Sequence, residues 1–303
     1  MTSSEIRNNG NGQGAALDTP REDGLVTTEY KYTGVQDFFL QDSPSANPGA
    51  IGAVPSRFGL SPRFSAWSDF KKEVESYAGP GEIKVFWLCR HGQGFHNLAE
   101  AKYGTEAWDA RWSLLNGDDE LTWGPDPLLT NLGKTQAMDL RQGWVTELAQ
   151  DVPFPERSFC SPLTRALETH DIVFGEQLKK RGKQTLVFEN LREHYGEHTC
   201  DKRQTLTYLR TSIPEKFPRS GFTFDEGMTE EDELWKPDSR EPDEELTARA
   251  ARAIEQVWQS AEGLKYVSIT AHNGFINGIL RAIGRTRYIL PTGGILPVVI
   301  RCV

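Results

Sequence analysis

Residues 83–97 read IKVFWLCRHGQGFHN, and this stretch decides the fold. Its first six residues form a nearly continuous apolar run after Pro80-Gly81, and the run is short enough for a strand buried on both faces. The polar residues from Arg90 to Asn97 then follow the carboxyl end of that strand. Because ligands of open α/β sheets bind at this end, the stretch predicts a buried strand that leads directly into a site.

Strand and helix patterns alternate along the rest of the chain. Apolar runs predict further strands at 185–188, 266–270 and 295–302, and a short strand is expected at 157–160. Helical spacing predicts helices at 67–77, 130–150, 163–174, 243–261 and 275–283. Two long polar segments, 103–127 and 193–240, interrupt this alternation, and loops of such length usually cover or line a site. The alternation predicts an α/β fold in which helices cover a mostly parallel sheet.

The composition of the 303 residues excludes several classes of protein. The 43 acidic and 34 basic side chains give a formal net charge of −9, which argues against binding of nucleic acid or of a membrane surface. No apolar run approaches the roughly 18 residues that a membrane-spanning helix needs. The start of the chain has no apolar stretch typical of a secretory signal, and the four cysteines are widely spaced. We therefore expect reduced thiols and a cytoplasmic location, with the nucleus as the alternative.

The domain organisation follows from a change in composition near the start. Residues 1–24 are rich in Asn, Gly, Ser and Thr, which predicts a disordered tail. Residues 25–82 combine aromatic side chains with Pro, Gly and Asp, and we interpret them as an irregular arm packed on the domain. Residues 25–303 are thus expected to form a single domain. The oligomeric state is left open.

Polar side chains with a shared chemistry follow four of the predicted strands at one sheet edge. They lie in the segments 90–97, 161–165, 191–196 and 271–274, and they include arginines, histidines and a glutamate. In an otherwise acidic protein, such a group predicts a pocket for an anion. Arginine forks match phosphate oxygens, and helix N-termini after these strands would add N–H donors.

These segments resemble the motifs of the histidine phosphatase superfamily, which is also called phosphoglycerate mutase-like. The matching pieces are RHG at 90–92 with His96-Asn97, LTNLGKTQA at 129–137, SPLTRA at 161–166, LRE at 191–193 and AHNG at 271–274. They occur in the family's order over about residues 83–303, which makes the likeness specific. The arm and the stretch 90–112 are most similar to fungal phosphoglycerate mutase-like phosphatases. The resemblance implies a three-layer α/β/α fold with a mostly parallel sheet, helices on both faces and long insertions over the active site.

The resemblance also implies a covalent mechanism that uses no metal and no other cofactor. His91 would attack phosphorus as a neutral ring whose other nitrogen is fixed by a backbone carbonyl. Arg90, Arg165 and His272 would clamp the phosphoryl oxygens and stabilise the developing charge. Glu193 would act as general acid and then general base, with a pKa raised by the neighbouring phosphate.

Further contacts with a small phosphorylated substrate are expected around these groups. Gly92, Asn97 and Asn273 would supply hydrogen bonds. Arg203 could reach a second anionic group of the substrate, although it could equally be a solvated residue at the start of a helix. His96 could orient a neighbouring catalytic group or only pack. The tryptophans at 108, 112 and 123 could roof the pocket or pack within the insertion.

Other interpretations of the same residues remain open. His194, His198, Cys200 and Asp201 have the chemistry of metal ligands, but their spacing matches no zinc pattern, so a structural or substrate-loop role is favoured. Hydrolysis of a phosphomonoester or diphosphate is favoured over phosphomutase activity, because true mutases carry an arginine where this chain has His194. A phosphomutase and a catalytically silent phosphate-binding protein are the alternatives.

Overall fold

A mixed sheet of seven strands runs through the centre of the molecule, in the order β1-β7-β2-β6-β3-β4-β5. The computed structural model describes residues 31–303, and the tail predicted for 1–24 lies outside them. The strands are β1 (Tyr32–Val35), β2 (Glu82–Arg90), β3 (Arg157–Cys160), β4 (Thr185–Val187), β5 (Phe222–Phe224), β6 (Tyr266–Ala271) and β7 (Ile295–Cys302). From β2 through β6, β3 and β4 to β5 all pairs are parallel, while β7 is antiparallel to β1 and β2. The mostly parallel sheet predicted from the sequence is confirmed.

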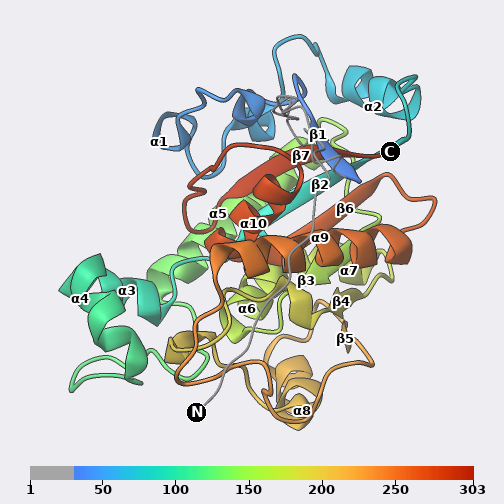
Figure 1. The fold of residues 1–303 in the computed structure, drawn as a ribbon. Coiled ribbons are helices and arrows are strands. Elements are labelled where there is room, and N and C mark those ends of the chain that lie inside the picture. The colour runs from blue at the N-terminus through green and yellow to red at the C-terminus, as the bar shows by residue number, and fades with distance from the viewer. Residues whose placement is uncertain (1–30) are drawn as a thin grey trace, which may run out of the picture.

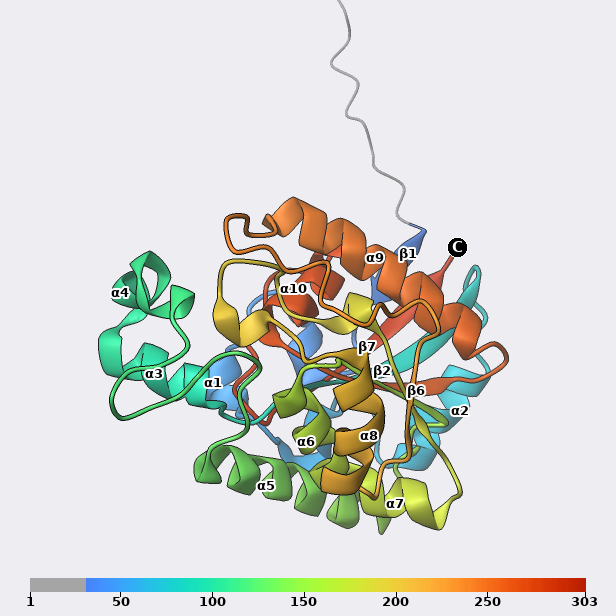
Figure 2. The same ribbon diagram turned by 90° about the horizontal axis from the view of Figure 1, so that it is seen from below.

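Helices cover both faces of this sheet, as Figures 1 and 2 show. One face packs against α9 (Asp243–Ser260) and α10 (Asn273–Ala282), and the other against α2 (Trp67–Glu75), α5 (Asn131–Leu148) and α7 (Gly175–Lys180) with the end of α6 (Thr164–Val173). The central residues of strand β2 are apolar because both faces of the strand are covered. Val85 and Trp87 face the α5 side, whereas Phe86 and Leu88 face the α9 side, and all four are fully buried. The three-layer α/β/α architecture is confirmed.

The arm before β2 packs its aromatic side chains on the sheet. Phe39, Phe58 and Trp67 contact Trp87 of β2 with ring centroids about 6 Å apart, 6.0, 5.8 and 5.9 Å respectively. Edge-to-face contacts of this kind add to the energy of burial. The short helix α1 (Pro48–Ile51) begins at Asn47, whose side chain caps it. No helix within residues 31–303 combines the length and the apolar character needed to cross a membrane.

The two segments predicted as long loops contain regular structure. The first continues from α3 (Phe95–Tyr103) into α4 (Thr105–Ala110), and the second holds α8 (Leu206–Lys216), β5 and the short 3-10 helix η5 (Thr199–Asp201). Most of these elements are short, and α8 carries Pro214 in its interior. Neither segment therefore shows a clear helical or strand periodicity of apolar residues in the sequence. The segments touch each other, because the Thr199 hydroxyl donates to the Leu115 carbonyl at 2.6 Å. We call the paired segments 103–127 and 193–240 the roof.

Candidate active site

A cavity of about 370 Å³ lies at the carboxyl ends of β2, β3 and β6, beneath the roof. Seven of the ten site residues expected from the sequence line it: Arg90, His91, His96, Asn97, Arg165, Glu193 and Asn273. The other walls come from α3, from the roof and from the segment after α10, through Glu100, Trp108, Asp109, His194, His198, Cys200, Asp201, Arg240, Gly274 and Arg287. Trp108 therefore covers the cavity, which is one of the two roles that the sequence allowed for it.

His91 is the first residue after β2, and its backbone N–H donates to the carbonyl of Ala271 at the end of β6. Its ring Nδ1 lies 2.7 Å from the Gly92 carbonyl, so Nδ1 carries the proton and Nε2 carries the lone pair. Burial, followed by the charges of Arg165 and Arg90, holds the pKa of His91 well below its ordinary value. The ring is therefore neutral, with Nε2 available as a nucleophile.

Arg165 is the second residue of α6 and is 1% exposed. Its Nε donates to Nε2 of His91 at 3.4 Å, which places the guanidinium beside the His91 ring. Its Nη1 donates to the Cys200 carbonyl at 2.7 Å and its Nη2 to Asp201 Oδ1 at 2.8 Å. The other oxygen of Asp201 accepts from Nη1 of Arg240 at 2.9 Å. A carboxylate from the roof thus neutralises two arginines that line the cavity.

Arg90 and His272 complete the ring of groups around His91. Arg90 Nη1 donates to the Leu290 carbonyl at 2.7 Å, and its Nε has no hydrogen-bond partner within residues 31–303. His272 is the N-cap residue of α10 and lies with its ring centroid 4.9 Å from that of His91. Its Nε2 lies 2.8 Å from the Ser161 hydroxyl, a contact that the sequence did not suggest. Burial and the charge of Arg165 hold the pKa of His272 well below its ordinary value, so this ring is also neutral.

Glu193 receives four hydrogen bonds, and they favour its ionised form. Its oxygens accept from the backbone N–H groups of Gly274 (2.9 Å) and Phe275 (3.1 Å) at the start of α10, and from the backbone and ring of His194 (both 3.2 Å). Burial alone would raise the pKa of Glu193, but the hydrogen bond and charge of His194 and the N–H of Gly274 lower it to about 2. Glycine at position 274 lets the Glu193 carboxylate lie against the start of α10, since a Cβ there would lie 2.1 Å from Glu193 Oε1.

His96 and Asn97 lie on α3 at the cavity wall. The His96 ring is 5.5 Å from that of His91, and its Nδ1 has no hydrogen-bond partner in the described part of the chain. The structure shows no hydrogen bond from this ring to Asn97 or Glu193. Asn97 Oδ1 accepts from the Gly94 N–H at 3.1 Å and so caps its own helix.

Gly92 and Asn273 are already engaged with the protein. The Gly92 N–H donates to the Thr169 hydroxyl at 3.0 Å, so this amide is not free for a phosphate oxygen. Position 92 also has no room for a side chain, because a Cβ there would lie 2.2 Å from the Gly133 carbonyl oxygen. Asn273 is the first residue of α10 and lines the cavity, while its backbone carbonyl accepts from the Asn277 side chain at 2.8 Å.

The expectation that Arg203 contacts the substrate is wrong for this structure. Arg203 is only 4% exposed and does not line the cavity. Its guanidinium forms an ion pair with Glu189 and donates to the backbone carbonyls of Gln204, Thr229 and Glu231. A buried guanidinium needs all of its donors satisfied, and here the roof satisfies them. Arg203 therefore stabilises the roof from inside, while Arg240, which the sequence did not single out, reaches the cavity.

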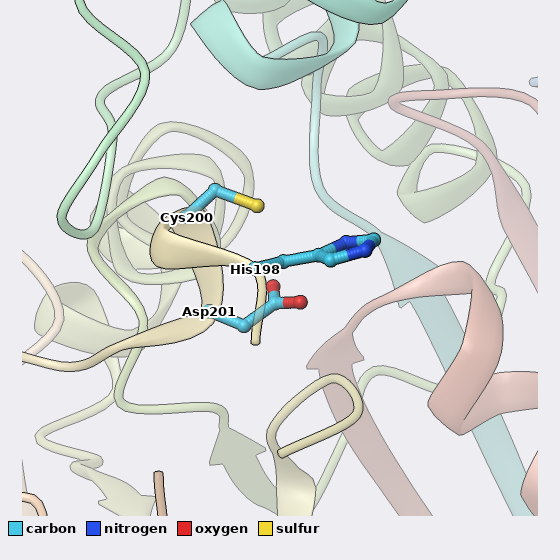
Figure 3. Close-up of side chains that lie close together, drawn as sticks. All are labelled: His198, Cys200 and Asp201. Carbon is cyan, nitrogen blue, oxygen red and sulfur yellow. The ribbon is translucent and has the colours of Figure 1, made fainter. Parts of the chain in front are cut away.

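His198, Cys200 and Asp201 lie close together, as Figure 3 shows, with potential ligand atoms all within 4.8 Å of one another. Their surroundings do not suit a cation. Both oxygens of Asp201 already pair with the guanidinium groups of Arg165 and Arg240. Burial and the charge of Asp201 raise the pKa of Cys200 well above its ordinary value, so the group would offer a thiol rather than a thiolate ligand. A divalent ion here would also face the two positive charges.

A neutral imidazole among arginines, at the end of a parallel strand, is suited to bind and exchange a phosphoryl group. The chain belongs to the histidine phosphatase superfamily (branch 1), whose family model matches residues 86–288. This membership supports an enzyme of phosphatase or mutase type.

Several fungal proteins are similar in sequence to this chain over most of its length. A probable phosphoglycerate mutase of Arthroderma benhamiae is 35% identical over 298 residues, which cover 92% of this chain and 87% of the relative. Phosphomutase-like protein 3 of Candida albicans is 33% identical, and the match covers 89% of this chain and 80% of the relative. The probable phosphoglycerate mutase PMU1 of Saccharomyces cerevisiae is 34% identical, and the match covers 77% of this chain and 84% of the relative. The fungal phosphoglycerate mutase-like resemblance stated from the motifs is confirmed.

Proposed function

We propose that the protein is a metal-independent phosphatase that hydrolyses a small phosphorylated metabolite through a phosphohistidine on His91. The observation that carries this proposal is the state of the His91 ring. Its Nδ1 is tied to the Gly92 carbonyl, the ring is neutral, and Nε2 lies beside the guanidinium of Arg165 in the cavity. A nucleophile held in one tautomer beside a cation needs little reorganisation to attack a phosphoryl group.

In the first half of the proposed reaction, the lone pair on His91 Nε2 attacks phosphorus and the bond from phosphorus to the leaving oxygen breaks. The leaving oxygen takes a proton that Glu193 delivers. Arg165 exchanges its contact with Nε2 for contacts with phosphoryl oxygens, and Arg90 and His272 donate to the others. Charge that builds on these oxygens is thereby stabilised without a metal ion.

In the second half, a water molecule attacks phosphorus and the bond from Nε2 to phosphorus breaks. Glu193 takes one proton from the water, which replaces the proton used in the first half, and inorganic phosphate leaves. His91 returns to its neutral state. The proton balance of the whole cycle is closed, so no proton acceptor outside the site is needed.

A phosphomutase is the second candidate, because two of the fungal relatives are named probable phosphoglycerate mutases. It would pass the phosphoryl group from His91 to a second hydroxyl rather than to water. Phosphoryl transfer between sugar or acid phosphates that outpaces phosphate release would favour it over the phosphatase.

The test is phosphate release from a panel of phosphomonoesters and diphosphates, with EDTA present. We expect release that survives EDTA and is lost in His91→Ala, whose cavity should still bind inorganic phosphate in calorimetry. Release that EDTA abolishes would refute the metal-independent mechanism. Release by His91→Ala at the wild-type rate would refute the phosphohistidine. No release from any compound, with phosphate still bound, would indicate a silent binding protein.

A further inference from the structure

His194 lies between two carboxylates, one inside the site and one at the surface. Its Nδ1 is 3.2 Å from Glu193 Oε1 and its Nε2 is 3.1 Å from Asp243 Oδ1. The side chain of Glu193 is 17% exposed, whereas that of Asp243 is 62% exposed. The imidazole therefore connects the carboxylate in the cavity with one that is open to solvent.

This geometry requires a proton on each ring nitrogen. A carboxylate can only accept a hydrogen bond, and a neutral imidazole has a single N–H to donate. One of the two contacts would then bring two acceptors together. An imidazolium satisfies both carboxylates at once, so the doubly protonated ring is the form that fits.

The other charges around His194 have opposing effects on whether its ring is protonated. Arg240 lines the same cavity and disfavours a positive ring, and Arg281 of α10 lies 3.3 Å from the Asp243 oxygen that His194 contacts. Burial alone would also lower the pKa of His194, but the hydrogen bonds to Glu193 and Asp243 raise it above its ordinary value. The balance favours the imidazolium.

The proton that the proposed chemistry needs is therefore not on Glu193 in the resting protein. Four N–H groups point at that carboxylate, which fits its ionised form. A general acid must nevertheless deliver a proton to the leaving oxygen. The nearest mobile proton is on Nδ1 of His194, in direct hydrogen-bond contact with Glu193.

We propose that His194 stores the proton that Glu193 delivers to the leaving group, an inference that rests on the proposed phosphatase function. As a negatively charged phosphate enters, the N–H bond at Nδ1 breaks and an O–H bond forms on Glu193. That O–H bond breaks when the leaving oxygen takes the proton. When water attacks the phosphohistidine, its proton goes to Glu193 and returns to Nδ1, while Asp243 holds the other N–H throughout. His194 thus acts through Glu193 and is a positioning residue that also holds a proton.

The first test uses two substrates that differ in their need for a proton. An alkyl phosphate must leave as an alcohol, whereas p-nitrophenyl phosphate leaves as a stable anion. His194→Arg keeps a cation beside Glu193 but cannot release a proton. We expect this variant to lose about 10²-fold in kcat for the alkyl phosphate, which is within the usual contribution of general acid catalysis. For the aryl phosphate we expect a change of about twofold or less, since only the protonation step is affected.

His198→Gln is the matched control for that comparison. His198 lines the same cavity, but its ring forms no hydrogen bond with a carboxylate in the described structure, so the ratio of the alkyl to the aryl rate should not change. An equal loss of both rates in His194→Arg would overturn the proton-store role. An unchanged alkyl rate in that variant would overturn it as well.

The second test follows the imidazole signals by NMR during a pH titration and needs no turnover. We expect His194 to titrate at a higher pH in the wild type than in Asp243→Asn or Glu193→Gln, each of which removes one carboxylate. A titration that neither variant shifts would overturn the inference. If the wild type hydrolyses neither substrate, the proposed function fails, whereas this titration still reports where the proton lies.

Discussion

Asp201 is an internal anion at the place where the site needs positive charge for a phosphate. It pairs with Arg165 at 2.8 Å and with Arg240 at 2.9 Å, and it is 3% exposed. Asp201→Asn removes its negative charge at nearly constant volume. We expect the variant to bind inorganic phosphate more tightly, because two arginines regain charge that the carboxylate now neutralises.

The size of the effect follows from Coulomb's law. A separation of roughly 7 Å between Asp201 and a bound phosphate, at an effective dielectric constant of about 20, gives about 2 kcal/mol of repulsion per phosphate charge. Removing it corresponds to about a thirtyfold lower Kd for each charge on the phosphate. The same substitution should destabilise the fold by about 1.5–3 kcal/mol, because the buried guanidinium of Arg165 loses a charged acceptor. Tighter binding together with lower stability would distinguish this mechanism from general damage.

The assay is calorimetric titration with inorganic phosphate, combined with urea denaturation of the same samples. Asp171→Asn is the matched control, since Asp171 is a buried partner of Arg219 that does not line the cavity. The control should lose stability and keep the wild-type phosphate affinity. Phosphate affinity that is unchanged or weaker in folded Asp201→Asn would refute the reasoning.

Three further outcomes can be measured directly. Gly92→Ala should lose about 1–3 kcal/mol of stability in denaturant, because its Cβ would lie 2.2 Å from the Gly133 carbonyl oxygen, and wild-type stability would contradict the close approach. Burial raises the pKa of Asp126 to about 6, above its value in the unfolded chain, so its contribution to the free energy of unfolding should fall as the pH rises from about 4 to about 6. Denaturation of Asp126→Asn over that range should show a flatter pH dependence, and an unaltered slope would exclude this assignment. Arg203→Gln should lose about 1.5–3 kcal/mol of stability, because Glu189 loses one of its two arginine partners and keeps only Arg192 at 3.1 Å. A higher KM in a fully stable variant would instead place Arg203 in the substrate site.

The fold and the centre of the site could be predicted from the sequence because both depend on where buried strands end. The apolar runs of β2 and β6 are long enough to recognise, and parallel pairing brings the carboxyl ends of β2, β6 and β3 to one edge. His91 and His272 each follow the last residue of a strand, so the strand positions alone place them together. Their ring separation of 4.9 Å is the direct result.

The roof could not be predicted in the same way, because ion pairs rather than periodic packing determine its path. Arg192 and Asp232 are forty residues apart and both nearly fully buried, and their pairing fixes a segment with no regular pattern. Such contacts decide that Arg240 reaches the cavity and that Arg203 does not. The hydrogen bonds that lower the pKa of Glu193 could not be predicted for a related reason. They depend on N–H groups of α10 that are remote from Glu193 in the sequence.

The contact between the two halves of the roof has a consequence for how substrate preference can change during evolution. Trp108, Trp123 and Cys200 pack in one cluster, and Thr199 bonds to Leu115 across 84 residues of sequence. A new side chain in either segment therefore changes the surface on which the other rests. Relatives with different substrates are expected to differ at both segments together, and a chimaera that exchanges only one of them should inherit neither parent's preference.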